Sequence, residues 1–124
     1  MGVTNAGKAL FANLILGSGT AITHMAVGSG TTAFAAAQTT LVTEITDSGV
    51  ERVAPTLSRI TTTVTNDTTK AIKTFSVTGT ITVAEGGLFN AAAAGDMPVR
   101  VVFSPARSLI SGDTITYQHT IVNA

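Results

Sequence analysis

The sequence predicts a mainly β protein, an antiparallel β-sandwich with one N-terminal α-helix. Three observations favour this fold class. After residue 20 the chain is rich in Thr, Val and Ile, which suit the pleated, half-buried surface of a sheet. Apolar and polar residues alternate along several short segments, as in strands with one buried face. Clusters of Gly, Asn, Asp and Pro separate these segments, and only the N-terminus has a strong helical pattern.

The N-terminal helix is expected over residues 6–16. Thr4 or Asn5 can cap its start, and Gly17 supplies a left-handed stop. Its apolar face consists of residues spaced four apart, namely Leu10 with Leu14 and Phe11 with Ile15. A helix of about three turns is marginal alone in water, so this face must dock on another surface. We expect docking on the sheet of its own domain; the alternative is an arm that docks on a neighbouring subunit.

The chain length suits one domain. Within it, residues 1–19 are expected to form the N-terminal helix or arm, and residues 20–124 the β-sandwich.

Alternation predicts four strands in the second half of the chain. The first, over residues 57–65, is followed by a turn over residues 66–69. The second is a continuous run whose apolar face consists of Phe75, Val77, Ile81 and Val83. Gly79 falls on the same face, which predicts a bulge or a close backbone approach there.

The third strand starts near Met97 and is expected to end at residues 104–106, Ser-Pro-Ala. Before it, the AAAAG segment of residues 91–95 is too short for a stable helix and is expected to be a loop. The fourth strand runs towards the C-terminus, with Ile115, Tyr117, His119 and Ile121 on one face.

The composition excludes several function classes. Seven basic and seven acidic residues give a formal net charge of zero, and only 11% of residues are charged. Nucleic acid and anionic lipid are therefore not expected as partners. No apolar run approaches the roughly 20 residues of a membrane helix. Because few charges keep copies apart, the protein is expected to work in an assembly.

No residue pattern predicts an active site or a cofactor. The chain has no Cys, and neither His24 nor His119 has an acidic residue at metal-ligand spacing, so both histidines are expected to be structural. The G-S-G triplets at residues 17–19 and 28–30 lack the Gly-Lys-Ser/Thr of a phosphate loop and are expected to be turns. There is no G-x-S-x-G nucleophile elbow.

Charged residues also give no catalytic pattern. Glu44, Glu51 and Glu85 fall in different expected elements, so a paired-carboxylate site is not predicted and the protein is not expected to be an enzyme. The scattered arginines do not form a basic stripe and are expected to form ion pairs at interfaces; they are Arg52, Arg59, Arg100 and Arg107. Gly86 and Gly87 are expected to form a bulge or turn that sends Leu88 and Phe89 into the core.

Three stretches together resemble small structural proteins of tailed-bacteriophage virions. They are Ile22 to Ile45 (ITHMAVGSGTTAFAAAQTTLVTEI), Ile81 to Ala92 (ITVAEGGLFNAA) and Gly112 to Ala124 (GDTITYQHTIVNA). The second is similar to the T-E-A-G-L-F-N-A strand of that group, with Glu85 and residues 87–91 in matching places and Gly86 where Ala is usual. The last looks like the group's closing strand. These motifs consist of turn and core residues, so they indicate a protein class and leave the partner-binding residues unknown.

The resemblance implies a structural role in the virion. The preferred hypothesis is a capsid decoration, or cement, protein that bridges subunits of the major capsid protein and stabilises the assembled head. A homo-oligomer, trimer or dimer, is expected, with the N-terminal helix and the Thr-rich sheet edges as contact elements. Assembly would take place in the host cytoplasm.

Two other roles also fit a small β-sandwich protein. One is a tail fibre, knob or baseplate component with tail proteins as partners, although the chain has neither coiled-coil heptads nor a collagen-like repeat. The other is a carbohydrate-binding module or adhesin, which is disfavoured because Trp is absent and Tyr117 is the only Tyr.

Overall fold

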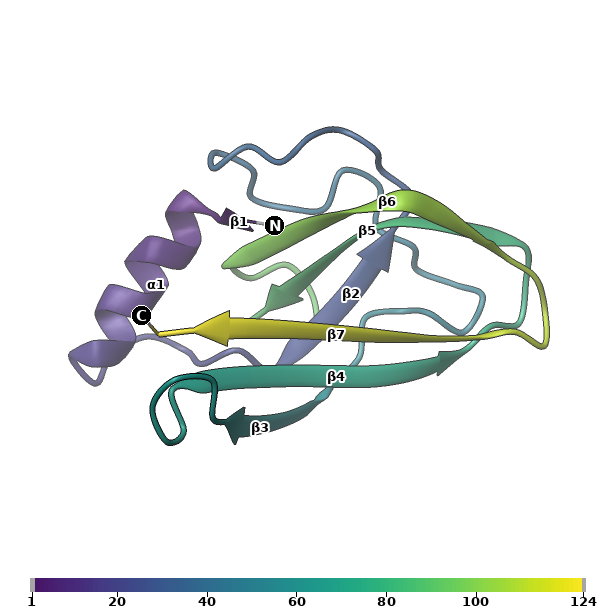
Figure 1. Cartoon of the computed structure of the whole chain (residues 1–124). Helices are drawn as coiled ribbons and strands as arrows, with labels where there is room; N and C mark the ends of the chain where they lie inside the picture. The colour runs from purple at the N-terminus through teal and green to yellow at the C-terminus, as the bar shows by residue number, and fades with distance from the viewer. Residues whose placement is uncertain (1, 124) are drawn as a thin grey trace.

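The computed structural model describes residues 2–123 and confirms the mainly β fold class. Seven strands form two antiparallel sheets that pack face to face, and a single helix lies at one end (Figure 1). The four-stranded sheet has the order β1-β6-β5-β2, and the three-stranded sheet has the order β3-β4-β7. The elements are β1 (Gly2–Val3), α1 (Asn5–Ile15), β2 (His24–Gly28), β3 (Thr56–Ile60), β4 (Thr68–Ser76), β5 (Ile81–Phe89), β6 (Val99–Leu109) and β7 (Thr114–Val122).

One core lies between the two sheets. Its buried residues include Met25 and Leu88 from the four-stranded sheet and Phe75 and Tyr117 from the three-stranded sheet. Alternation along each strand places these side chains on the inner faces, as the sequence pattern predicts. Tyr117 and His119 are both buried, so the expected inner face of the last strand is confirmed at these positions.

The four-stranded sheet is also buried on its outer face. A second cluster consists of Ala26, Leu41, Phe89 and Met97. Ala26 and Phe89 alternate with core residues along β2 and β5, so they point away from the three-stranded sheet. Leu41 belongs to the long connection of residues 29–55, whose first part therefore acts as a third layer over this sheet, while Val50 of the same connection is buried in the inter-sheet core. The double burial explains why seven consecutive residues of β5, Val83 to Phe89, are buried.

Helix α1 docks on its own domain, as expected, through Leu10 and Phe11, but its last apolar residue, Ile15, stays exposed. Thr4 caps the helix by accepting a hydrogen bond from the backbone N–H of Gly7 at 2.9 Å, and its hydroxyl donates to the carbonyl of Met97 at 2.6 Å. Thr4, Gly7 and Leu10 are buried. At the other end Gly17 has φ +78°, the predicted left-handed stop.

The strand predicted over residues 57–65 is too long at its C-terminal end. β3 stops at Ile60, and residues 61–67 form a loop. The carboxylate of Asp67 accepts hydrogen bonds from the backbone N–H groups of Thr62, Thr63 and Val64, at 2.8 to 2.9 Å. These bonds, led by the one from Val64, hold the pKa of Asp67 well below its usual range. A local side chain thus competes with the sheet for the backbone.

The single run predicted through Phe75 and Val83 is two strands, and this prediction is wrong. β4 ends at Ser76 in one sheet and β5 begins at Ile81 in the other, so residues 77–80 cross between the sheets. Gly79 lies in this crossing and not in a strand. A Cβ at Gly79 would lie 2.6 Å from the Ser48 hydroxyl, so the predicted close approach exists, although there is no bulge at Gly79.

Two further turn predictions are wrong. The Ser-Pro-Ala segment of residues 104–106 does not end the third predicted strand, because β6 continues to Leu109. The segment instead forms a bulge in the β5–β6 ladder. Val83 pairs with Arg107 and Glu85 pairs with Val102, so residues 103–106 of β6 lie opposite the single residue Ala84 of β5. Gly86 and Gly87 lie inside β5, where a Cβ on Gly86 would be 2.6 Å from the Tyr117 ring. They permit close packing and form no turn, although Leu88 and Phe89 are buried as predicted.

Candidate partner-binding surface

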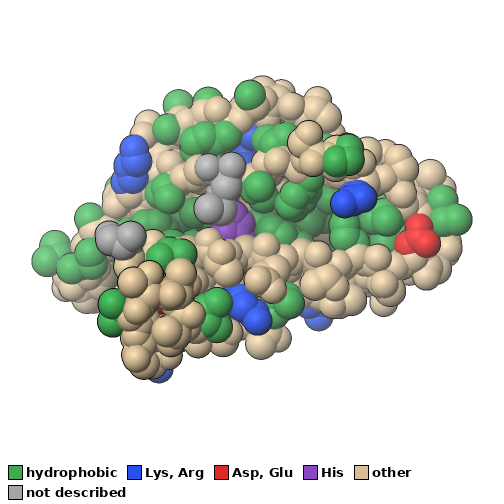
Figure 2. Space-filling view, in the orientation of Figure 1, with side chains coloured by type: hydrophobic (Ala, Val, Ile, Leu, Met, Phe, Trp, Pro, Cys, Tyr) green, Lys and Arg blue, Asp and Glu red, His purple; other side chains and the backbone are tan. Residues whose placement is uncertain are grey.

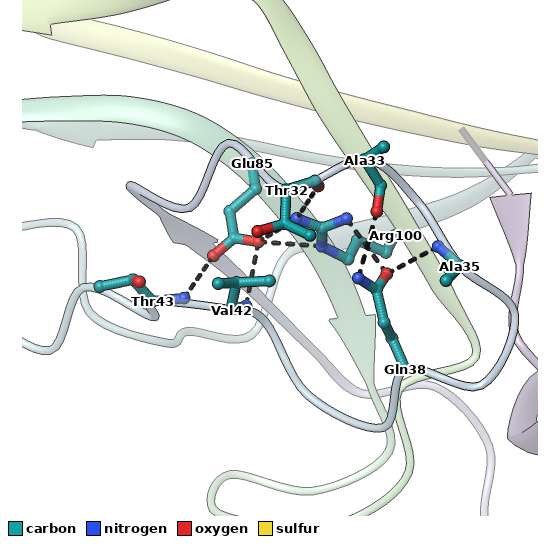
Figure 3. A network of polar contacts seen from close by, with 8 residues as sticks. All are labelled: Thr32, Ala33, Ala35, Gln38, Val42, Thr43, Glu85 and Arg100. Atoms are coloured by element: carbon teal, nitrogen blue, oxygen red, sulfur yellow. Dashed lines mark hydrogen bonds and ion pairs between the residues drawn. The ribbon is translucent and has the colours of Figure 1, made fainter.

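A network of polar contacts is buried beneath the outer layer and joins that layer to the four-stranded sheet (Figure 3). Glu85 of β5 and Arg100 of β6 form an ion pair with an Nη2–Oε2 distance of 2.7 Å, and both side chains are fully buried. Arg100 also donates through Nε to Glu85 at 2.9 Å, so the contact is bidentate on the arginine side.

The remaining polar atoms of this pair bind the outer layer. The Glu85 carboxylate accepts from the backbone N–H groups of Val42 and Thr43, and Arg100 donates to the Thr32 carbonyl and the Gln38 side chain. The pair thereby attaches residues 32–43 to the sheet. Glu85, one of the three glutamates weighed for a paired-carboxylate site, is fully buried in this network.

The G-S-G triplet at residues 28–30 has a packing role beside this pair. A Cβ at Gly28 would lie 2.4 Å from Glu85 Oε1, and one at Gly30 would lie 2.8 Å from the same atom. Glycine is therefore required because the carboxylate passes close to the backbone.

Arg52 forms a second internal ion pair. Its Nη2 lies 2.7 Å from Glu44 Oε1, its Nη1 donates to the carbonyls of Ala91 and Ala94, and its guanidinium carbon lies 3.6 Å from the centroid of the Phe89 ring. Arg52 thus joins the outer layer to the loop of residues 91–95. The expected interface role is wrong for Arg52 and Arg100, whose partners lie in their own chain. Arg59 is exposed on β3 and Arg107 on β6.

The two histidines lie apart in the fold. The ring of His24, which is partly exposed, shares a hydrogen bond with the Thr23 hydroxyl. His119 is buried, and its Nδ1 shares a hydrogen bond with the Tyr117 hydroxyl, while Nε2 has no partner among residues 2–123. Burial lowers the pKa of His119 to about 4 and raises that of Tyr117 above its usual range. In the same part of the chain no three acidic, His or Cys side chains group as metal ligands.

An apolar surface is exposed at the end of the molecule where α1 stops. A groove there, which we call the α1 groove, lies between the helix and the ends of β3, β4 and β7. Its apolar lining consists of Phe11, Leu14, Ala21, Ile22, Leu57 and Ile121. The two residues after Leu14 in the chain, Ile15 and Leu16, are 85% and 82% exposed. Figure 2 shows hydrophobic side chains at this end.

This surface is the strongest candidate for partner binding. Exposure of two adjacent large aliphatic side chains beside an apolar groove is unfavourable in an isolated protein and is typical of contact sites. Only Arg59 among the groove residues is charged. The helical pattern could have located the surface from sequence, because Leu14 and Ile15 belong to the predicted apolar face. The pattern could not show that Ile15, at the end of the helix, stays exposed while Leu10 and Phe11 dock.

Comparisons with known proteins leave the family open. No protein-family model matches the chain, and no curated protein matches its sequence significantly. Within residues 2–123 no helix has the length and apolar character required to cross a bilayer.

Proposed function

We propose that this chain is a structural protein of a tailed-phage virion, a decoration protein that binds the assembled head and stabilises it by bridging subunits of the major capsid protein. The exposed apolar surface at the end of α1 carries the proposal, together with the sequence resemblance. A protein that binds only the assembled shell stabilises it by mass action. The ion pairs of Arg52 and Arg100 are made within the chain, and neither arginine lines the exposed apolar groove.

The α1 groove, with Ile15 and Leu16, is the surface that we assign to the shell contact. Its aliphatic side chains would be buried against an apolar patch of the capsid protein, at about 25 cal/mol per Å² of apolar area. The docked first half of the helix fixes the position of the exposed second half. The ordering cost of binding is therefore small.

A binding assay with matched variants tests this assignment. Ile15→Gln combined with Leu16→Gln should weaken binding to purified shells at least tenfold, because two anchors are lost and helix propensity is kept. Ile110→Gln is the control, since Ile110 is 61% exposed in the turn between β6 and β7, at the other end of the molecule. It should bind like the wild type. Equal loss in both would reject the groove as the contact.

The copy number per particle tests the virion role itself. Quantitative mass spectrometry of purified virions should find hundreds of copies in a simple ratio to the major capsid protein. A few to a few tens of copies would place the chain in the tail, as a fibre, knob or baseplate component. Absence from the particle would reject both locations.

A further inference from the structure

Strand β7 is a free sheet edge without the usual protection. It pairs only with β4, so its other side has no strand partner among the described residues. Its nine residues, TITYQHTIV, include no Pro, Lys, Arg, Asp or Glu. Soluble proteins normally protect long edges with such residues, because unpaired backbone groups are a template for another strand.

The other edges are protected. β3 has five residues and carries the exposed Arg59. β6 extends beyond β1, and this part contains the bulge with Pro105 and the exposed Arg107. β2 is covered by single bridges from Met25 to Val53 and from Gly28 to Glu44. β7 is therefore distinct among the described edges.

The ladder with β4 determines which backbone groups face outward. Asn123 donates to the Asp67 carbonyl, and Val77 donates to the Asp113 carbonyl. Both pairs follow the register of the β4–β7 ladder, in which Tyr117 lies opposite Lys73. Hydrogen-bonded and non-hydrogen-bonded pairs alternate in an antiparallel ladder. The odd-numbered residues of β7 thus bond to β4, and the even-numbered ones direct N–H and C=O outward: Thr114, Thr116, Gln118, Thr120 and Val122.

We propose that two copies of this chain pair antiparallel through their β7 edges, about a two-fold axis at Gln118. In this register Gln118 lies opposite Gln118 of the partner subunit, and Thr116 lies opposite Thr120 of the partner subunit. All nine residues pair, and outward-facing residues meet outward-facing residues, so each such pair exchanges two hydrogen bonds. The two three-stranded sheets become one continuous sheet of ordinary size.

Charge and side-chain chemistry favour a second copy as the occupant. When two copies of a charged edge strand pair with each other, like charges come close together, as would happen with Arg59 on β3. Strand β7 has no Lys, Arg, Asp or Glu, so its self-pairing carries no such repulsion within the strand. The cross-strand pairs of Thr have a precedent inside the chain, where the hydroxyls of Thr74 and Thr116 lie 2.8 Å apart on the outer face. The edge is about 30 Å long at the usual rise per residue.

The edge also borders a groove between β6 and β7. Its apolar lining consists of Val102, Phe103, Pro105, Ile115 and Tyr117, and its polar lining consists of Ser104, Arg107, Thr116 and Gln118. A strand added to β7 would lie beside this groove and shield part of it from water, which adds apolar burial to the backbone hydrogen bonds. The pairing does not depend on the proposed virion role.

Sedimentation of the full chain over a concentration series tests the pairing. The wild type should show a monomer–dimer equilibrium. Gln118→Pro should be monomeric, because proline removes the outward N–H while leaving the bonds to β4 intact. Gln118→Ala is the matched control and should dimerise like the wild type. Circular dichroism checks that each variant is folded.

A charge pair tests the two-fold register. Thr116→Lys with Thr120→Lys would oppose two lysines across the axis and should abolish the dimer. Thr116→Lys with Thr120→Glu would oppose Lys to Glu at both places and should dimerise. A wild type that stays monomeric at about 100 µM, a concentration well above a micromolar Kd, would overturn the proposal. So would a trimer, or a dimer that persists in both the proline and the double-lysine variants.

Discussion

At the scale of single residues, the Glu85–Arg100 pair shows how a charge in an apolar strand is tolerated. Desolvation of two ions is costly, and it is offset only when the remaining hydrogen-bonding groups are satisfied. Here the carboxylate receives two backbone N–H groups as well as the guanidinium. The backbone of the outer layer thus supplies hydrogen bonds that water would otherwise give to the two charges. The position of the outer layer therefore depends on both Glu85 and Arg100.

Removing one member of this pair should destabilise the protein strongly. Glu85→Gln leaves Arg100 buried without a counter-charge, and we expect a loss of about 3 to 5 kcal/mol in the free energy of unfolding, measured by urea denaturation. Glu44→Gln is the matched control, because Glu44 and Arg52 form a partly exposed pair. Its loss should be about 1 kcal/mol. Similar losses in the two variants would contradict a special role for the buried pair.

His119 should make the stability depend on pH. Its pKa is lowered by burial from 6.5 to about 4. Between these values the unfolded chain binds the proton more strongly than the folded chain, so the stabilisation is complete above about pH 6.5 and is lost as the pH falls towards 4. At about 1.4 kcal/mol per pKa unit, the decrease is about 3 kcal/mol. Urea denaturation at several pH values measures it.

His119→Gln is the comparison for this pH dependence. Glutamine can accept the Tyr117 hydroxyl hydrogen bond but does not titrate. The decrease in unfolding free energy between pH 6.5 and 4 should therefore be smaller in the variant by about 3 kcal/mol. An equal decrease in the wild type and the variant would show that other groups cause it.

At the scale of elements, helix α1 is attached through its N-terminal cap as well as through apolar packing. Thr4 joins the first turn of the helix to the segment that enters β6, through Gly7 on one side and Met97 on the other. The apolar second half contributes less to docking, because Ile15 and Leu16 are exposed. This polar side chain therefore helps to position the candidate contact surface, together with the packing of Leu10 and Phe11.

Thr4→Ala should loosen this attachment. We expect a loss of about 1 to 2 kcal/mol, the usual range for an N-cap. Ser18→Ala removes a hydroxyl that is exposed and lies beyond the other end of the helix, and it should change stability by less than about 0.5 kcal/mol. Thermal unfolding followed by circular dichroism gives both values. A neutral Thr4→Ala variant would mean that packing of Leu10 and Phe11 holds the helix.

Element prediction from the sequence succeeded where one local pattern decides. The N-terminal helix, its stop at Gly17 and the last strand were predicted closely, because spacing and turn chemistry act over a few residues. It failed where remote or competing contacts decide. The Asp67 carboxylate accepts hydrogen bonds from the backbone of residues 62–64, which ends β3 early. The chain crosses to the other sheet after Ser76, although the apolar–polar alternation continues along the sequence.

The candidate site could be predicted only in part. The exposed Ile15 belongs to a recognised apolar face, but its exposure depends on how the helix docks. The Glu85–Arg100 pair has one sequence signal, a glutamate within an apolar strand, and nothing in the sequence identifies its partner among the four arginines. The free edge of β7 becomes visible only when the order of strands in the sheet is known.

At the scale of the whole molecule, the four-stranded sheet is the middle of three layers. The three-stranded sheet lies on one side of it, and the connection that contains Leu41 lies on the other. The inter-sheet core contacts one face, and the cluster around Phe89 lies on the other. If the two sheets and the outer cluster form one cooperative unit, damage to the outer cluster must destabilise the three-stranded sheet as well, although they lie on opposite faces of the four-stranded sheet. Tyr117 is a convenient reporter for that sheet, because it is buried there and the chain has no Trp and no other Tyr.

Phe89→Ala should therefore shift two signals equally. We expect a loss of about 3 to 5 kcal/mol, since the ring is buried and supports the Arg52 guanidinium. Tyr117 fluorescence and far-ultraviolet circular dichroism should give the same denaturation midpoint. Val64→Ala, at a position 65% exposed in the β3–β4 turn, should stay within about 0.5 kcal/mol of the wild type. If dichroism shifted while fluorescence kept the wild-type midpoint, the outer layer would unfold separately, and the ion pair beneath it would stabilise that layer alone.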